Sequence, residues 1–254
     1  MVESSYFPNH SSESFLFSTE KDLYISWTEQ LLDTNFLYIT KLEGDSWSNK
    51  ELITKGTDWF VNWADFPSIS LNEVSGSIFS FHLQKSSEET FSYDVNYHIN
   101  TKETWNDMNK IHDDNTFSEH GFVSSIPFKD GFMVSWLDGR NTYGVGDHGH
   151  AKGAMTIRSA YLDSNGNIVN QNVIDEMVCE CCQTSMTISN DIPLVVYRDR
   201  SKHEIRDIYY SRYIDSDWTE PQPIHNDGWE INGCPVNGPN VDSYGDNVVV
   251  SWFS

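Results

Sequence analysis

Short runs of alternating apolar and polar residues recur along the chain, and they predict paired β-strands. Residues 15–18 lead through a polar turn into residues 23–27, and residues 122–126 lead through Lys129-Asp130-Gly131 into residues 132–136. Apolar alternation on both sides of a short polar turn is typical of β-hairpins. The same arrangement recurs at residues 66–82, 184–197 and 239–252. The spacing of about 55 residues between the five copies is that of a four-stranded propeller blade.

A third apolar run follows each of the first four hairpins, and a tryptophan-led or polar turn into an outer strand follows it. The third runs lie at residues 35–39, 93–97, 155–158 and 207–210, and the tryptophans that lead the turns are Trp47, Trp105 and Trp218. Each unit is therefore a β-meander of four strands, and repeated meanders predict an all-β propeller.

We expect one domain over residues 1–254 that holds about four and a half blades of a propeller that is six-bladed when complete. The blades are predicted at residues 11–55, 60–112, 117–175, 181–228 and, for the partial fifth, 234–254. On this interpretation the sequence is a fragment of a longer protein.

Composition and charge narrow the classes of partner. The chain has 38% hydrophobic and 14% aromatic residues, which is a globular composition. Its 38 acidic residues outnumber 16 Lys and Arg, giving a net charge of −22, so its field repels phosphate backbones and argues against nucleic acid as a partner. No apolar run is long enough for a membrane span.

Unusual polar residues lie in the loop that precedes the first strand of each unit, here called the leading loop. Asp65, Glu119, His120 and Asn237 belong to these loops, as do the cysteines. A propeller brings all its leading loops to one face around the central channel. We therefore expect a concave pocket there that binds a carbohydrate or another small molecule.

Three arginines lie near the predicted strand ends, Arg140 and Arg198 where second strands end and Arg206 where the next strand begins. Arg140, Arg198 and Arg206 each have acidic neighbours in sequence. One interpretation is that Arg198 and Arg206 pair with residues such as Asp199 and Glu204 to brace the blades. The other is that the arginines form a cluster that holds a substrate carboxylate, which a guanidinium recognises at two points.

The four cysteines fall in two places, Cys179, Cys181 and Cys182 in one leading loop and Cys234 in the next. One alternative is a disulfide between Cys234 and a member of the cluster, as expected of an exported protein. Another is a soft metal, copper or zinc, bound by the thiolates with His120 nearby. A third is a reactive thiol. The Cys-x-Cys-Cys spacing is not that of a zinc ribbon, so the identity of a metal stays open.

The remaining histidines form no obvious site. His148 and His150 lie in a glycine-rich stretch that could be an exposed loop, a lid or a metal site. Surface positions are expected for five others, which are His10, His98, His112, His203 and His225.

The chain resembles bacterial sialidase-family propellers. The segments that carry the likeness are residues 63–67, 119–122, 136–140, 181–184, 197–200, 204–207 and 234–239. Residues 98–105 are the nearest to an Asp-box turn, Ser-x-Asp-x-Gly-x-Thr-Trp, and keep only Thr104 and Trp105. The family's early Phe-Arg-Ile-Pro motif is absent.

The resemblance implies an exo-α-sialidase-like glycoside hydrolase acting on sialic-acid-type or other acidic glycans. It implies a monomer in the periplasm or outside the cell. Sialidases use three arginines on the substrate carboxylate, a tyrosine nucleophile with a glutamate partner, and an aspartate acid/base. On that pattern Arg140, Arg198 and Arg206 are candidates for the arginines, Asp65 for the acid/base, and Glu119 lines the pocket. The alternatives are a non-catalytic propeller that binds a metal or glycan through its cysteine cluster, and a purely structural module.

Overall fold

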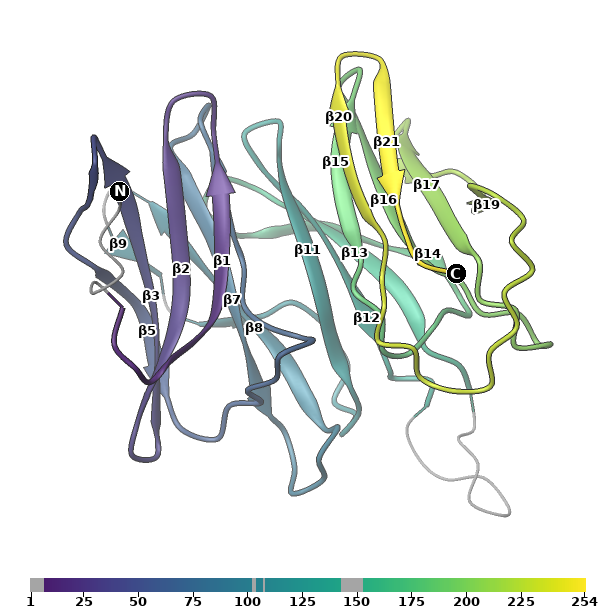
Figure 1. The fold of residues 1–254 in the computed structure, drawn as a ribbon, viewed down its shortest axis with the longest axis horizontal. Coiled ribbons are helices and arrows are strands. Elements are labelled where there is room, and N and C mark those ends of the chain that lie inside the picture. Colours follow the sequence, from purple (N-terminus) through teal and green to yellow (C-terminus); the bar gives the residue numbers. More distant parts are fainter. Residues whose placement is uncertain (1–6, 102–103, 107, 143–152) are drawn as a thin grey trace.

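The computed structural model describes residues 7–101, 104–106, 108–142 and 153–254. His148 and His150 lie outside these residues. The described chain is all-β, as predicted, and its antiparallel sheets fan side by side (Figure 1). Within the same ranges no helix has the length and apolar character that crossing a membrane requires.

Five sheets follow one another along the chain. The first contains β1 (Ser11–Ser18), β2 (Leu23–Leu31), β3 (Thr34–Glu43), β4 (Ser46–Trp47) and β5 (Glu51–Gly56). The second contains β6 (Ile69–Asn72), β7 (Ser77–Lys85), β8 (Tyr93–Thr101), β9 (Thr104–Trp105) and β10 (Asn109–Lys110). The third contains β11 (His120–Phe128), β12 (Gly131–Asp138), β13 (Thr156–Leu162) and β14 (Ile168–Asp175).

The last two sheets complete the described chain. The fourth contains β15 (Ser185–Ser189), β16 (Ile192–Arg198), β17 (Ile208–Ile214), β18 (Asp217–Trp218) and β19 (Gln222–Pro223). The fifth is a hairpin of β20 (Asn240–Tyr244) and β21 (Asn247–Ser251). In the first four sheets the first three strands pair in sequence and the outer strands pair with the third, which is the meander that the repeated pattern predicts.

The first strands of successive sheets contact one another and form the inner lining of the fan. β1 lies against β6, β6 against β11, β11 against β15, and β15 against β20. Hydroxyl groups connect these strands, as in the 2.6 Å contact of Ser70 with Ser125 and the 2.9 Å contact of Ser124 with Thr184. Small polar side chains suit this position because adjacent inner strands come close together while their backbones pair within their own sheets.

The core lies between the sheets. Phe79, Phe81, Tyr97, Phe132 and Trp136 fill the space between the second and third sheets and are buried. Every residue of β12 is buried, because a middle strand is covered on both faces by neighbouring sheets. Each such large apolar side chain contributes about 1.5–3 kcal/mol by leaving water. The aromatic composition is thus what holds one blade against the next.

Two of the inner strands carry the same irregularity. β1 shifts register between Ser12 and Phe15, and β11 shifts between Gly121 and Ser124. Glu13 and Phe122 lie in these bulges with φ of 53° and 51°, in the left-handed region that residues other than glycine rarely adopt. A bulge changes the direction in which the neighbouring side chains and N–H groups point. Both bulges lie at the start of an inner strand, beside the leading loops.

Candidate functional site

The leading loops of the second to fifth sheets are joined by direct hydrogen bonds. Gln183 donates its side-chain amide to the carbonyl of Ala64 at 2.8 Å and accepts the N–H of Gly238 at 3.2 Å. The N–H of Phe122 donates to Asp65 Oδ1 at 2.8 Å. Residues far apart in sequence therefore meet at one rim, as the propeller arrangement predicts.

A cavity of about 330 Å³ opens at this rim between the inner strands. All five sheets line it, through residues that include Phe15, Asp65, Ser124, Thr184 and Asn240. Its polar lining is mostly hydroxyl and amide groups, with Asp65 as the ionisable group. This composition fits a small ligand rich in hydroxyls.

Asp65 and Glu119 share one tyrosine. The Oη atom of Tyr93, at the start of β8, lies 2.9 Å from Asp65 Oδ2 and 2.8 Å from Glu119 Oε1. Asp65 is 3% exposed and Tyr93 is fully buried, whereas Glu119 is partly exposed. Gly121 permits this packing, because a Cβ atom there would collide with Asp65 Oδ2.

The two hydrogen bonds at the Tyr93 oxygen require a second proton besides that of the phenol itself. A phenol has a single O–H to donate, so it satisfies one carboxylate, and the second contact requires a protonated carboxyl group that donates to the phenol oxygen. Burial raises the pKa of Asp65 to about 7, opposed by its hydrogen bonds from Phe122 and Tyr93. Burial also raises the pKa of Glu119 to about 7, against the hydrogen bond from Tyr93. The single phenol proton and the two raised pKa values together favour one protonated carboxyl in the pair near neutral pH.

Glu13 adds a third perturbed acid to the same rim. Its Oε1 atom accepts the N–H of Asn62 at 2.9 Å, which ties the bulge of β1 to the leading loop of the second sheet. Burial raises the pKa of Glu13 to about 7, and its charge in turn raises the pKa of Asp65. The local field at Asp65 therefore favours the neutral acid.

The three arginines do not gather in one place, and their donors face the protein. Arg198 is almost completely buried and donates to the carbonyls of Arg206, Asn237 and Phe253. Its guanidinium also lies over the ring of Trp229, 4.4 Å from the centroid. Arg198 braces loops, as one interpretation of the sequence predicts, but its partners are carbonyls and not the carboxylates expected.

The other two arginines each pair with acidic side chains. Arg206 donates to Glu204 at 2.8 Å and to Glu180 at 3.2 Å. Arg140 belongs to a different cluster, where its Nε donates to Asp138 at 2.8 Å and its Nη1 donates to Asp113 at 2.8 Å. Since each guanidinium has internal partners, the role of these arginines in holding a substrate carboxylate stays a prediction.

His120 lies in a buried cluster of histidines and carboxylates. Its ring stacks on that of His112 with centroids 3.7 Å apart, and the two rings share Asp114 Oδ2 at 3.1 and 3.0 Å. Asp94 lies 3.3 Å from His112 Nε2, and Asp138 lies 3.7 Å from His120 Nε2. The described partners of His120 are thus carboxylates, carbonyls and His112. The expectation that it completes a cysteine metal site is corrected.

Two histidines expected at the surface are buried. His112 is held between Asp94 and Asp114, and His98 contacts His82 at 3.2 Å across β7 and β8. Burial lowers the pKa of His98 to about 4, so its ring is neutral at physiological pH. The other three, His10, His203 and His225, are exposed as expected.

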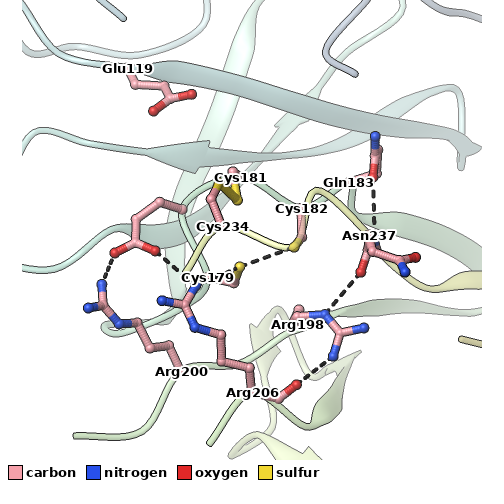
Figure 2. The surroundings of a disulfide bond; sticks show 12 residues. Glu119, Cys179, Cys181, Cys182, Gln183, Arg198, Arg200, Arg206, Cys234 and Asn237 are labelled. Carbon is pink, nitrogen blue, oxygen red and sulfur yellow. Dashed lines mark hydrogen bonds and ion pairs between the residues drawn. A yellow bond between two sulfur atoms is a disulfide. The ribbon is translucent and has the colours of Figure 1, made fainter. Parts of the chain in front are cut away.

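The cysteines divide into a disulfide and a pair of thiols (Figure 2). Cys181 is bonded to Cys234, which joins the leading loops of the fourth and fifth sheets and confirms the disulfide alternative. Cys179 and Cys182 are free and buried, with their sulfurs 3.1 Å apart. Because Cys181 and Cys234 use their sulfurs for the bond, a metal stays a prediction for the remaining pair alone.

Comparison with known proteins supports the fold. No family model matches the sequence, and no curated protein does. Two neuraminidase-like structures, from A/bat/Guatemala/164/2009 and A/little yellow-shouldered bat/Guatemala/060/2010, each align with a TM-score of 0.53 over 82% of this chain, at 11% and 12% identity. This chain spans about half of their length, covering 53% and 58%.

An α-L-arabinofuranosidase from Lactobacillus brevis aligns with a TM-score of 0.50 at 11% identity, over 96% of this chain and 83% of its own. At these identities the likeness concerns the fold alone. The chain therefore has the propeller fold found in neuraminidase-like and glycosidase structures.

Proposed function

We propose that this protein cleaves glycosidic bonds at the rim cavity, with Asp65 and Glu119 as its pair of carboxyl groups. The observation that carries the proposal is the shared hydrogen bonding of both groups to Tyr93, with both pKa values raised to about 7. Glycoside hydrolysis needs one protonated carboxyl to donate to the leaving oxygen and one ionised group to act opposite it. A network that holds one such proton at neutral pH provides both forms.

The spacing of the two acids favours a double displacement. Both reach the same phenol oxygen, so their nearest oxygens lie within roughly 6 Å of each other, which is shorter than the spacing that admits a water between acid and base. Asp65 lines the cavity and is the better placed proton donor. Glu119, which is partly exposed, is the candidate nucleophile, and Tyr93 holds the two acids at this spacing.

The substrate class is the second part of the proposal. Each of the three arginines has internal partners, and the net charge of −22 repels anions. Both observations favour a neutral glycoside over a sialoside. The Cys181–Cys234 bond supports a protein that works in an oxidising compartment, outside the cytoplasm.

The test is hydrolysis of a panel of fluorogenic glycosides that includes an α-L-arabinofuranoside and a sialoside, at pH 5 to 8. We expect release from a neutral glycoside, and a fall of about 10²–10⁴-fold in kcat for Asp65→Asn and Glu119→Gln. Asp191→Asn, an exposed aspartate in a turn, is the matched control and should retain full activity. Binding of a glycan without release of any fluorophore would contradict catalysis and favour the non-catalytic alternative.

A further inference from the structure

Two thiols and a disulfide lie within reach of one another in the leading loop of the fourth sheet. The sulfurs of Cys179, Cys181 and Cys182 all lie within 4.8 Å of one another. Cys181 already holds the bond to Cys234, and the Cys179 and Cys182 sulfurs touch at 3.1 Å. Figure 2 shows the Cys179 sulfur below the disulfide and the Cys182 sulfur to its lower right. An attacking thiol, a disulfide and a resolving thiol are therefore present in one site.

The surroundings of Cys179 favour its thiolate, which is the reactive form. Arg206 donates from Nη1 to Cys179 Sγ at 3.1 Å, and Glu204 and Glu180 hold the same guanidinium in place. The hydrogen bond from Cys182 and the charge of Arg206 lower the pKa of Cys179 to about 6, against the opposing effect of burial. The hydrogen bond with Cys179, burial and the charge of the Cys179 thiolate all raise the pKa of Cys182, so that residue keeps its proton.

We propose that Cys179 and Cys182 are an exchange-active dithiol that takes over the disulfide from Cys181 and Cys234. In the first step the Cys179 thiolate attacks Cys181 Sγ, the Cys181–Cys234 bond breaks, and the Cys234 thiolate leaves and takes a proton from water. In the second step Cys182 attacks Cys179 Sγ in the new Cys179–Cys181 bond. Its proton passes to the departing Cys181 thiolate.

The exchange needs no outside oxidant or reductant, because one disulfide and two thiols are present before and after it. Its product is a Cys179–Cys182 bond in a Cys-x-x-Cys segment, together with thiols at Cys181 and Cys234. Cys234 is exposed, whereas the original thiols are buried. The exchange thus moves thiol reactivity from the interior to the surface, and it frees the leading loop of the fifth sheet from its covalent tie. The exposed Cys234 thiol is the group on which a disulfide-containing partner or a thiol reagent would act.

Tryptic digestion followed by mass spectrometry distinguishes the two disulfide isomers, Cys181–Cys234 and Cys179–Cys182. No Lys or Arg lies between Ser159 and Arg198, so Cys179, Cys181 and Cys182 share one peptide, and Cys234 lies in the peptide of residues 213–254. The starting isomer gives these two peptides linked to each other. The exchanged isomer gives them separate, with an internal disulfide in residues 159–198 and an alkylated Cys234.

The whole protein is incubated at pH 6 to 8.5, quenched in acid, denatured, alkylated with N-ethylmaleimide and digested. We expect the separate peptides to increase with time and pH, and to be absent in Cys179→Ser. Cys182→Ser should still expose Cys234 but stop at the Cys179–Cys181 bond. Arg206→Met should shift the pH profile of exchange to higher pH and slow the reaction about tenfold at pH 6.5. Arg206→Lys keeps the positive charge and is the matched control.

Three results would overturn the proposal. The first is that the peptides stay linked at every pH with only Cys179 and Cys182 alkylated, while the melting curve shows a folded protein. The second is that Cys179→Ser exchanges as fast as the parent chain. The third is stoichiometric copper or zinc in the purified protein, with the thiols shielded until a chelator is added, because the pair would then be a metal site.

Discussion

Replacing Asp65 by Asn tests whether the rim holds a neutral carboxylic acid. The pKa of Asp65 is about 7 in the folded chain against 3.8 as the reference value. The folded state therefore binds more protons than the unfolded state between about pH 4 and 7, and the stability contributed by Asp65 falls as pH rises through that window. A difference of three pKa units corresponds to roughly 4 kcal/mol of unfolding free energy, which is lost as the pH rises from about 4 to about 7.

An asparagine removes this titration and keeps the hydrogen bonds. Its amide oxygen can accept the N–H of Phe122 as Asp65 Oδ1 does, and its amide N–H can donate to the Tyr93 oxygen. We therefore expect Asp65→Asn to gain stability relative to the parent chain as pH rises from 4.5 to 7.5. The difference between the two proteins should grow by up to about 4 kcal/mol.

The measurement is urea unfolding of both proteins at intervals of one pH unit, followed by tryptophan fluorescence. Taking the difference between variant and parent cancels the titration of groups that both share, such as His112 and Asp114. Asp191→Asn makes the same chemical change at an exposed turn, and its difference from the parent should stay flat across the range. A flat difference for Asp65→Asn as well would refute the buried neutral acid and the proton count on which the proposed catalysis depends.

Three further changes test the surrounding structure. Arg198→Met removes three hydrogen bonds to carbonyls and should lower the free energy of unfolding by about 3 kcal/mol or more in urea titrations, whereas an unchanged midpoint would mean that the guanidinium braces nothing. Cys234→Ser opens the bridge to Cys181, 53 residues away, and should cost about 4 kcal/mol, a loss that addition of reductant to the parent chain should reproduce. Burial lowers the pKa of His112, but the hydrogen bond to Asp114 and the other carboxylate contacts outweigh it and raise the pKa above the ordinary value. The stability that the His112–Asp114 pair contributes should therefore be lost as pH rises through the raised pKa. A ring titration by NMR at or below the ordinary histidine value would contradict this.

The arrangement of strands could be predicted from the sequence because hydrophobic alternation and turn residues are local signals. The hairpins at residues 15–27 and 122–136 appear as β1 with β2 and β11 with β12. The tryptophans that lead the outer turns are the last residues of the short strands β4, β9 and β18. Because the pattern repeats, a strand whose assignment is ambiguous in one unit can be assigned from the equivalent strands of the other units.

The site could be predicted only as far as topology determines it. Asp65 and Glu119 lie in leading loops, and loops at equivalent places in a propeller share a face. Tyr93 was missed, because it begins the third strand of its unit and reaches the acids only through the packing of three segments. His112 was missed for a related reason. Asp114 is only two residues away, but Asp94 on β8 and His120 on β11 reach His112 through packing that no local pattern fixes.

Buried polar groups at the rim differ in whether their hydrogen-bonding capacity is satisfied, and this difference assigns their roles. Arg198 donates three of its five N–H groups to carbonyl oxygens and lies over the ring of Trp229, so most of its hydrogen bonding is used within the protein. Asp65 and Glu119 compete for a single phenol proton, and Asp65 lines the cavity, so the protonation of the pair depends on pH and on the ligand that enters. A carboxyl group with a pKa near 7 can exchange protons with a substrate at neutral pH, whereas a guanidinium stays protonated and cannot. For that reason the carboxyl pair, and not the arginines that the sequence makes conspicuous, is where we place the chemistry.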